Sequence, residues 1–173
     1  MKICLICACG KNGEIGLNNK LLWNVPEDFK KFKELTLHSV IIMGRNTFES
    51  LPGILPNRFH VVITSSDLEE SFFVKKVSDI DEALKVASGL VNYNSERVWI
   101  IGGAQLYNYC LENDYIDYAY LSKIDFEGEA DTFIDINLIE QKFNCVYTEE
   151  HEEINKDGNI IPYWSFNHYK KRR

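Results

Sequence analysis

The sequence predicts an α/β fold in a single domain spanning residues 1–173, with a central, mostly parallel sheet and an antiparallel C-terminal hairpin. Three observations predict it. Apolar β-rich segments alternate with helix-like segments through about residue 125, which indicates parallel strands joined by crossovers. Asp157-Gly158, between the last two apolar runs, is a strong hairpin signal. The 173 residues contain no repeat and no long linker, and this length suffices for one domain with a substantial core.

The individual strands and helices are expected from apolar spacing. Runs rich in β-branched and aromatic residues predict strands at KICLICA (2–8), SVIIM (39–43), FHVVITS (59–65), RVWIIG (97–102), YAYLSKI (118–124), FNCVYTEE (143–150) and PYWSFNHY (162–169). Apolar residues at helical spacing predict helices at EDFKKFKEL (27–35), NTFESL (46–51), DIDEALKVASGL (79–90) and AQLYNYCLEN (104–113).

The segment from Gly10 to Leu22 is expected to be a long, mobile loop over a strand end. Its glycines, in GKNGEIG, do not match the G-x-G-x-x-G pattern, and the Asn12-Gly13 pair is typical of a turn. Loops of this length are usually functional and often act as lids. A lid over the site is therefore expected here.

Composition and charge limit the class of protein. A chain that is 45% hydrophobic and 26% charged fits a soluble globular protein and excludes a disordered one. The net charge of -7 and pI of about 5.1 argue against nucleic acid as a partner, because phosphate binding requires a positive field. No apolar stretch approaches the roughly 18 residues of a membrane span. The N-terminal MKICLICACG is interpreted as a strand, not a signal peptide, so a cytoplasmic location is expected.

Cysteine and histidine could supply redox, metal or hydrolytic chemistry. The candidates are Cys4, Cys7, Cys9, Cys110, Cys145, His38, His60, His151 and His168. In a strand the two cysteines of CLIC point to opposite faces, and no second Cys-x-x-Cys or His pair completes a zinc site. The cysteines are expected to be buried small hydrophobic residues, and no metal site is expected. The histidines lack catalytic spacing and are interpreted as surface or edge residues. No G-x-S-x-G or H-E-x-x-H motif supports hydrolysis.

Three strand ends carry features suited to phosphate. They are Gly44 followed by Arg45, Asn46 and Thr47; the pair Gly102 and Gly103; and the hydroxyls of Ser65 and Ser66. Each alone is typical of an ordinary turn. Parallel strands, however, place their carboxyl ends at one edge of the sheet, where such folds bind ligands. Together the features predict a dinucleotide, and the serines with Arg45 favour NADPH over NADH. In folds that bind NAD, an acid about 20 residues after the glycines holds the ribose. Asp125 lies near that distance after Gly102 and Gly103, so this rule does not decide between NADPH and NADH.

Asp28, in WNVPEDFKKF, is an acid on the apolar face of an expected helix. One interpretation is structural, because Pro26 followed by Glu27 and Asp28 is how many helices begin. The other is chemical, because a carboxylate with restricted water can hold a flat cationic or amidine-like ring through two charge-assisted hydrogen bonds. Phe29 and Phe32 would clasp that ring. If a nicotinamide cofactor is present, its chemistry is hydride transfer, and Asp28 is the acid expected to face the pocket.

Six motifs in one order resemble the dihydrofolate reductase family. They are IGLNNKLLWNVPEDFKKFKELT (15–36), IIMGRNTFESL (41–51), LPNR (55–58), VVITSS (61–66), VWIIGGAQLY (98–107) and ADTF (130–133). The resemblance covers roughly residues 1–135. It implies a twisted eight-stranded sheet flanked by about four helices, and reduction of 7,8-dihydrofolate to 5,6,7,8-tetrahydrofolate with NADPH.

The resemblance also implies residue roles. Asp28 is expected to bind the ring N–H and amino groups of the pterin and to promote protonation at N5 while hydride reaches C6; Trp23, the second catalytic residue, is expected to order a nearby water. Arg58 is expected to hold the substrate's glutamate carboxylate, although from the residues alone it is interpreted as a solvated loop arginine. The implied substrate-binding residues are Ile6, Ala8, Asp28, Phe29, Phe32, Leu51, Leu55, Arg58, Ile101 and Ser122. The implied cofactor-binding residues are Ala8, Ile15, Gly44, Arg45, Asn46, Thr47, Ser65, Ser66, Ile101, Gly102, Gly103, Ala104, Gln105, Leu106, Tyr107 and Thr132.

Four positions depart from the family's pattern. Leu22 replaces a frequent proline, which bears on lid mobility, and Ala104 replaces a common third glycine, which bears on the approach to the pyrophosphate. Asn46 stands where a basic residue is frequent, which weakens the argument for a 2′-phosphate. Ser122 replaces a common threonine and loses a methyl group but keeps the hydroxyl.

Two other functions stay open. A reductase of a ribosylated pyrimidine shares the fold, but Asp28 beside paired phenylalanines, with Arg58 for a free carboxylate, favours the folate substrate. A non-catalytic nucleotide-binding module needs no ionisable group in its pocket, so Asp28 argues against it. Because members of the family are commonly monomers, a monomer is expected.

Overall fold

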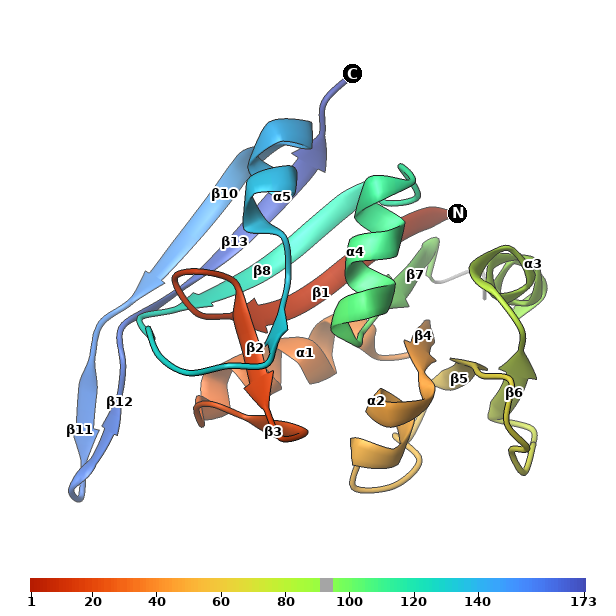
Figure 1. The fold of residues 1–173 in the computed structure, drawn as a ribbon, viewed down its shortest axis with the longest axis horizontal. Helices are drawn as coiled ribbons and strands as arrows, with labels where there is room; N and C mark the ends of the chain where they lie inside the picture. Colours follow the sequence, from red (N-terminus) through yellow and green to blue (C-terminus); the bar gives the residue numbers. More distant parts are fainter. Residues whose placement is uncertain (91–94) are drawn as a thin grey trace.

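The computed structural model describes residues 1–90 and 95–173, and its centre is a sheet of eight strands (Figure 1). The strands are β1 (Lys2–Cys9), β4 (Val40–Gly44), β5 (Phe59–Ile63), β6 (Val74–Val77), β7 (Arg97–Ile100), β8 (Tyr118–Ile124), β10 (Phe143–His151) and β13 (Trp164–Lys171). Their order is β10-β13-β8-β1-β7-β4-β5-β6. Within this sheet β13 runs antiparallel to both β8 and β10, and the other pairs are parallel. The expected α/β class and mostly parallel eight-stranded sheet are confirmed.

Helices pack on both faces of the sheet. They are α1 (Pro26–Thr36), α2 (Arg45–Ser50), α3 (Ile80–Leu90), α4 (Ala104–Glu112) and α5 (Ile136–Lys142). The first four coincide with the helix-like segments of the sequence. The fifth, α5, adds to the expected set: it is only 7 residues long, too short for a clear helical period, and begins where Asp135 accepts a hydrogen bond from Leu138 N at 2.9 Å. None of these helices within the described ranges is long and apolar enough to cross a membrane.

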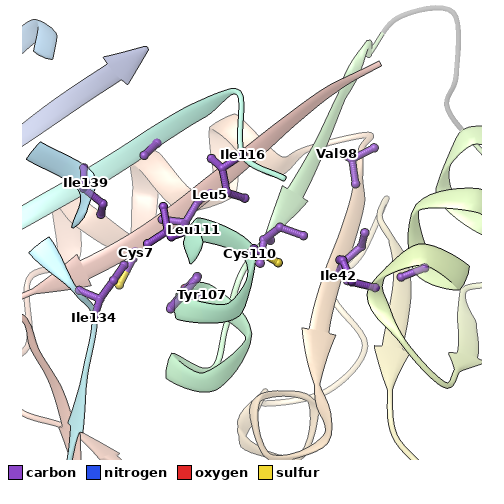
Figure 2. Close-up of a cluster of buried hydrophobic side chains, with 14 of the residues drawn as sticks. Leu5, Cys7, Ile42, Val98, Tyr107, Cys110, Leu111, Ile116, Ile134 and Ile139 are labelled. Carbon is purple, nitrogen blue, oxygen red and sulfur yellow. The ribbon is translucent and has the colours of Figure 1, made fainter. Parts of the chain in front are cut away.

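The buried side chains form two cores, and β1 contributes residues to both. Leu5, Cys7 and Cys9 contribute to the core beneath α3, α4 and α5, part of which Figure 2 shows. Cys4 and Ile6 contribute to the opposite core, against which residues of α1 and α2 pack. This alternation follows from the twofold side-chain period of a strand. It confirms that the cysteines of CLIC point to opposite faces.

The C-terminal hairpin forms at the expected place. The strands β11 (Ile154–Lys156) and β12 (Asn159–Ile161) pair antiparallel beyond the end of β10 and β13 (Figure 1). Asp157 and Gly158 both have positive φ angles, 53° and 81°, which is the backbone of a tight two-residue hairpin turn. The hairpin prediction is confirmed.

The segment from Gly10 to Leu22 differs from the expected continuous loop. It contains β2 (Glu14–Leu17) and β3 (Lys20–Leu21), which join β9 (Thr132–Phe133) in a small sheet of order β3-β2-β9. Gly13 has φ +86°, and a Cβ at this position would collide with the carbonyl oxygen of Ile134. Pairing with a distant strand, which local sequence does not reveal, gives this segment its regular structure.

Two smaller expectations are wrong. His60 is fully buried in β5 and is not a surface or edge residue, because its ring is enclosed between two loops. Leu55 N donates to His60 Nε2 at 3.1 Å, so the other ring nitrogen carries the proton and donates to the carbonyl of Phe73, 3.2 Å away. Cys145 is exposed on β10, whereas the other cysteines are buried as expected. Its strand is at the edge of the sheet and exposes most of its side chains.

Glu14 is a buried carboxylate that the sequence did not single out. Its Oε1 accepts from Asn12 N at 2.6 Å, and its Oε2 accepts from Gly128 N at 3.2 Å. These bonds join the N-terminal segment to the loop after β8. A buried charge requires such partners.

We predict that Glu14→Ala lowers the free energy of unfolding by roughly 2–4 kcal/mol, because two backbone N–H groups lose a charged acceptor. Urea denaturation measures the change. Glu14→Gln, which keeps an acceptor oxygen, should lose less. The control is Glu127→Ala, which removes an exposed glutamate from the loop after β8. It should change the free energy of unfolding by no more than about 0.5 kcal/mol. Equal losses for Glu14→Ala and Glu127→Ala would contradict the structural role of Glu14.

Candidate active site

The expected phosphate features meet at one edge of the sheet. Gly44 ends β4, and Gly102 and Gly103 follow β7, its neighbour in the sheet. Gly44 N donates to Gly102 O at 2.9 Å, and Ile101 N donates to Ile42 O at 3.0 Å. The turns leading into α2 and α4 are therefore hydrogen-bonded to each other.

The turn before α4 is tight at Gly102, whereas a Cβ at Gly44, before α2, would make only an ordinary contact. Gly102 has φ +130°, and a Cβ there would come within 3.1 Å of Thr47 Oγ1 and 3.4 Å of the Tyr107 hydroxyl. A Cβ on Gly44 would lie 3.9 Å from Gly103 N. The peptide bond between Gly102 and Gly103 is cis. The glycines thus expose backbone at the start of α4, where a phosphate can approach N–H groups.

Arg45 contacts the segment that follows β5, in which Ser65 and Ser66 lie. Arg45 Nη1 donates to the carbonyl of Asp67 at 2.7 Å, and Arg45 Nε pairs with Glu49 at 2.7 Å. Ser65 and Ser66 directly precede Asp67 in the sequence, and both are exposed. A cavity of about 390 Å³ is lined by Thr64, Ser65, Glu70, Lys76, Val77, Ser78 and Glu82. Lys76 is a cation near Ser65 that the sequence did not single out, because β6 itself was not recognised.

The remaining expected cofactor residues lie on several elements. Ala8, the last but one residue of β1, is half-buried, and Ile15 on β2 packs against the core beneath α4. Ala104, Gln105, Leu106 and Tyr107 form the first turn of α4. Asn46 and Gln105 are exposed, and Thr132 is exposed on β9 with its hydroxyl donating to Gly16 O at 3.1 Å. Glycines, helix starts and hydroxyls around one edge fit the phosphates of a dinucleotide.

Asp28 lies in the first turn of α1, so the structural interpretation of this acid holds. Its chemical environment also matches the second interpretation, because the carboxylate is half-buried and its Oδ1 accepts a hydrogen bond from Ser122 Oγ on β8. Burial raises the pKa of Asp28, and the bond from Ser122 and the charge of Lys31 act against this rise. Across the described residues, Ser122 supplies the one hydrogen bond to this carboxylate, so Oδ2 is available to a ligand.

Most of the apolar residues expected to bind substrate lie in or against one core of the sheet. Ser122 pairs with Ala8 of β1, and Ile6 lies two residues earlier on the same strand. Ile6 and Ile101 are buried, and Phe32, Leu51 and Leu55 are partly buried against the same core. Phe29 is 45% exposed. Trp23 packs against the same core and its ring lies 5.6 Å from that of Phe126. These residues therefore share the core against which α1 also packs.

Arg58 is buried, so its interpretation as a solvated loop arginine is wrong. Nε donates to Thr36 Oγ1 at 2.9 Å, Nη1 to Pro56 O at 2.5 Å and Nη2 to Lys33 O at 2.7 Å. Burial lowers the pKa of Arg58. These bonds hold the guanidinium against the C-terminal end of α1.

Comparisons with known proteins agree with this geometry. The family model described as dihydrofolate reductase matches residues 2–171. The chain is 38% identical over 137 residues to dihydrofolate reductase type 9 of Escherichia coli, covering 78% of this chain and 76% of that protein. It is 40% identical over 129 residues to dihydrofolate reductase of Bacillus subtilis (strain 168), covering 75% and 73%. Among solved structures, dihydrofolate reductase from Enterococcus faecalis complexed with NADP(H) and RAB-propyl is similar, with a TM-score of 0.79, 28% identity and coverage of 99% and 97%.

We predict that Asp28→Asn raises the free energy of unfolding at neutral pH. Because burial raises the pKa of Asp28, the folded state binds this proton more tightly than the unfolded chain does. The ionised carboxylate therefore destabilises the folded state above the folded pKa, and this effect disappears below the unfolded pKa. Urea denaturation at neutral pH and in acid measures the difference. Ser122→Ala keeps the charge but removes its donor, and should lower stability at neutral pH by about 1.5–3 kcal/mol. An Asp28→Asn variant less stable than the wild type at neutral pH would refute this account.

Proposed function

Because the chain belongs to the dihydrofolate reductase family, we infer that it reduces 7,8-dihydrofolate to 5,6,7,8-tetrahydrofolate with NADPH. It is therefore an NADPH-dependent oxidoreductase of one-carbon metabolism and tetrahydrofolate biosynthesis, and an antifolate target. The observation that carries the reaction is the half-buried carboxylate of Asp28, held by Ser122 near the edge where the two glycine turns meet.

Asp28 is proposed to bind and orient the pterin. Its carboxylate accepts hydrogen bonds from the ring N–H and the neighbouring amino group, a pairing that is stronger than its neutral equivalent. The negative charge held beside the ring makes N5 easier to protonate. Trp23 is proposed to order the water near this site, and Phe29 and Phe32 to enclose the ring.

The glycine turns and helix starts are proposed to hold NADPH, which supplies the hydride. Gly44, Gly102 and Gly103 let backbone approach the pyrophosphate, and the first turns of α2 and α4 present N–H groups to it. Arg45 and Ser65 are proposed to bind the 2′-phosphate. Ala8 and Ile15, on β1 and β2, are proposed to lie against the nicotinamide and limit its contact with water.

Arg58 is proposed to hold the glutamate carboxylate of the substrate. A guanidinium has five N–H donors in a fixed fork, and three of those on Arg58 are engaged by Thr36, Pro56 and Lys33. Two N–H donors are left, one on Nη1 and one on Nη2. They match the two oxygens of a carboxylate.

We further propose that residues 1–173 act as a single domain, as a cytoplasmic monomer with no nucleic-acid partner. The net charge of -7 supports the last point. All five cysteines are free, and such chains suit a reducing compartment. Gel filtration with light scattering tests the monomer.

The function is tested by following oxidation of NADPH by the purified protein with dihydrofolate, with NADH in parallel. Oxidation that requires dihydrofolate and is blocked by a diaminopyrimidine antifolate supports it. A folded protein that binds NADPH but oxidises it only with a ribosylated pyrimidine would overturn the substrate and keep the cofactor.

We predict that Asp28→Asn lowers kcat/KM for dihydrofolate at neutral pH by about 10²-fold or more, because the amide cannot hold the charge that favours protonation of N5. Activity should recover in part in acid, where the substrate is already protonated. The pH profile of kcat/KM measures both effects. Unchanged turnover at neutral pH would remove Asp28 from the mechanism.

We predict that Arg58→Lys raises KM for dihydrofolate by roughly tenfold or more, because an ammonium cannot offer the two-pronged fork. A dihydropterin without the glutamate tail provides the control, since its KM should stay near the wild-type value. The same loss with both substrates would show that Arg58 acts on the fold of the site and not on the carboxylate.

A further inference from the structure

Three residues form a row across neighbouring strands and face α1. Ser122 of β8 pairs with Phe166 of β13, and Phe166 pairs with Glu149 of β10. Ser122 donates to the carboxylate of Asp28. Lys31 Nζ lies 3.0 Å from Glu149 Oε1 and 4.7 Å from the centroid of the Phe166 ring. Asp28 and Lys31, which are three positions apart in α1, therefore contact the same row.

We propose that Lys31 is a positioning residue for the reaction, whose ammonium, held by Glu149 and Phe166, keeps the neighbouring carboxylate of Asp28 charged and aligned. Glu149 sets the strength of this effect by neutralising part of the positive charge. The proposal rests on the proposed function, because it concerns the carboxylate that binds the pterin.

The placement of Lys31 makes its charge effective. Side chains three positions apart on a helix are neighbours, with about 5–6 Å between their Cβ atoms. The side chain of Lys31 is only 24% exposed, so solvent and salt screen its charge less than that of an open surface lysine. Its position over Phe166 adds a cation–π contact that holds the ammonium near the sheet.

The other titratable groups that the charge of Asp28 affects are themselves uncharged at neutral pH. They are the thiols of Cys7 and Cys9 on β1 and the hydroxyl of Tyr107 on α4. Burial raises the pKa of Cys9 to about 12, and raises the pKa of Cys7 and of Tyr107 well above the usual values. On α1 itself, Glu27 and Lys30 are exposed. Lys31 is thus the cation that offsets the burial of Asp28.

Glu149 also contacts two residues of its own strand. His151 Nε2 lies 2.6 Å from Glu149 Oε1, and the Tyr147 hydroxyl donates to Glu149 Oε2 at 3.1 Å. The His151 ring stacks on Trp164 with centroids 4.1 Å apart. Hydrogen bonding to Lys31 lowers the pKa of Glu149 despite some burial. Groups of the protein itself therefore hold the ion pair in place.

The proposal is tested by titrating Asp28 in the ligand-free protein by ¹³C NMR of labelled carboxylates, with Asp28→Asn identifying the signal. Lys31→Met should raise the pKa of Asp28, because a nearby positive charge is lost. Glu149→Gln should lower it, because a negative charge is lost. Lys31→Arg should restore the wild-type titration, and the matched control Lys30→Met, from an exposed position on the same helix, should leave it unchanged.

The same variants should shift the pH profile of kcat/KM for dihydrofolate. Lys31→Met should move it to higher pH, with a loss of roughly threefold on the acidic side, and Glu149→Gln should move it the other way. If Glu149 acted only by holding Lys31 in place, Glu149→Gln and Lys31→Met would shift the pKa of Asp28 and the pH profile in the same direction. That result would overturn the proposal. An Asp28 titration in Lys31→Met identical to that of Lys30→Met would also overturn it. Because the NMR titration needs no substrate, failure of the proposed function appears separately, as an absence of dihydrofolate-dependent oxidation.

Discussion

The parallel pairing of β1 with β7 and β8 is the constraint on which the rest of the structure depends. Parallel strands cannot be joined by tight turns, so their connections become helices that cover the faces of the sheet. Their carboxyl ends necessarily meet at one edge. The pairing of β4 with β7 then sets Gly44 beside Gly102, and the pairing of β1 with β8 sets Ala8 beside Ser122. The site is a consequence of strand register.

The carboxylate of Asp28 lies in an environment that opposes its charge. Burial disfavours the carboxylate, yet α1 is oriented so that Ser122 donates to it and Lys31 lies near it. Both compensating groups depend on the same row of paired residues on β8, β13 and β10. The antiparallel insertion of β13 between β8 and β10 therefore influences the chemistry of a helix near the other end of the sequence.

Buried polar side chains also hold the loops around the site. Glu14 binds the backbone of the N-terminal segment and of the loop after β8, and Arg58 binds carbonyls at the end of α1. His60 accepts from the backbone of Leu55, in the loop that contains the expected substrate residues Leu51 and Leu55. Each group is enclosed and hydrogen-bonded, as buried polar groups must be. These hydrogen bonds therefore fix the loops to the rest of the fold.

The sequence by itself determined seven of the eight strands of the central sheet, four of the helices, the glycine turns and the position of Asp28 at a helix start, because these depend on local periodicity and local backbone preferences. It missed β6, whose VKKV carries two lysines, and the short helix α5. Only the tertiary structure decided that Arg58, His60 and Glu14 are buried, that Cys145 is exposed and that Lys31 pairs with Glu149. The physical reason is separation along the chain: Ser122 lies 94 positions from Asp28, and Gly128 lies 114 from Glu14. Burial and hydrogen bonding between residues so far apart in the sequence result from strand pairing, which a local sequence pattern does not predict.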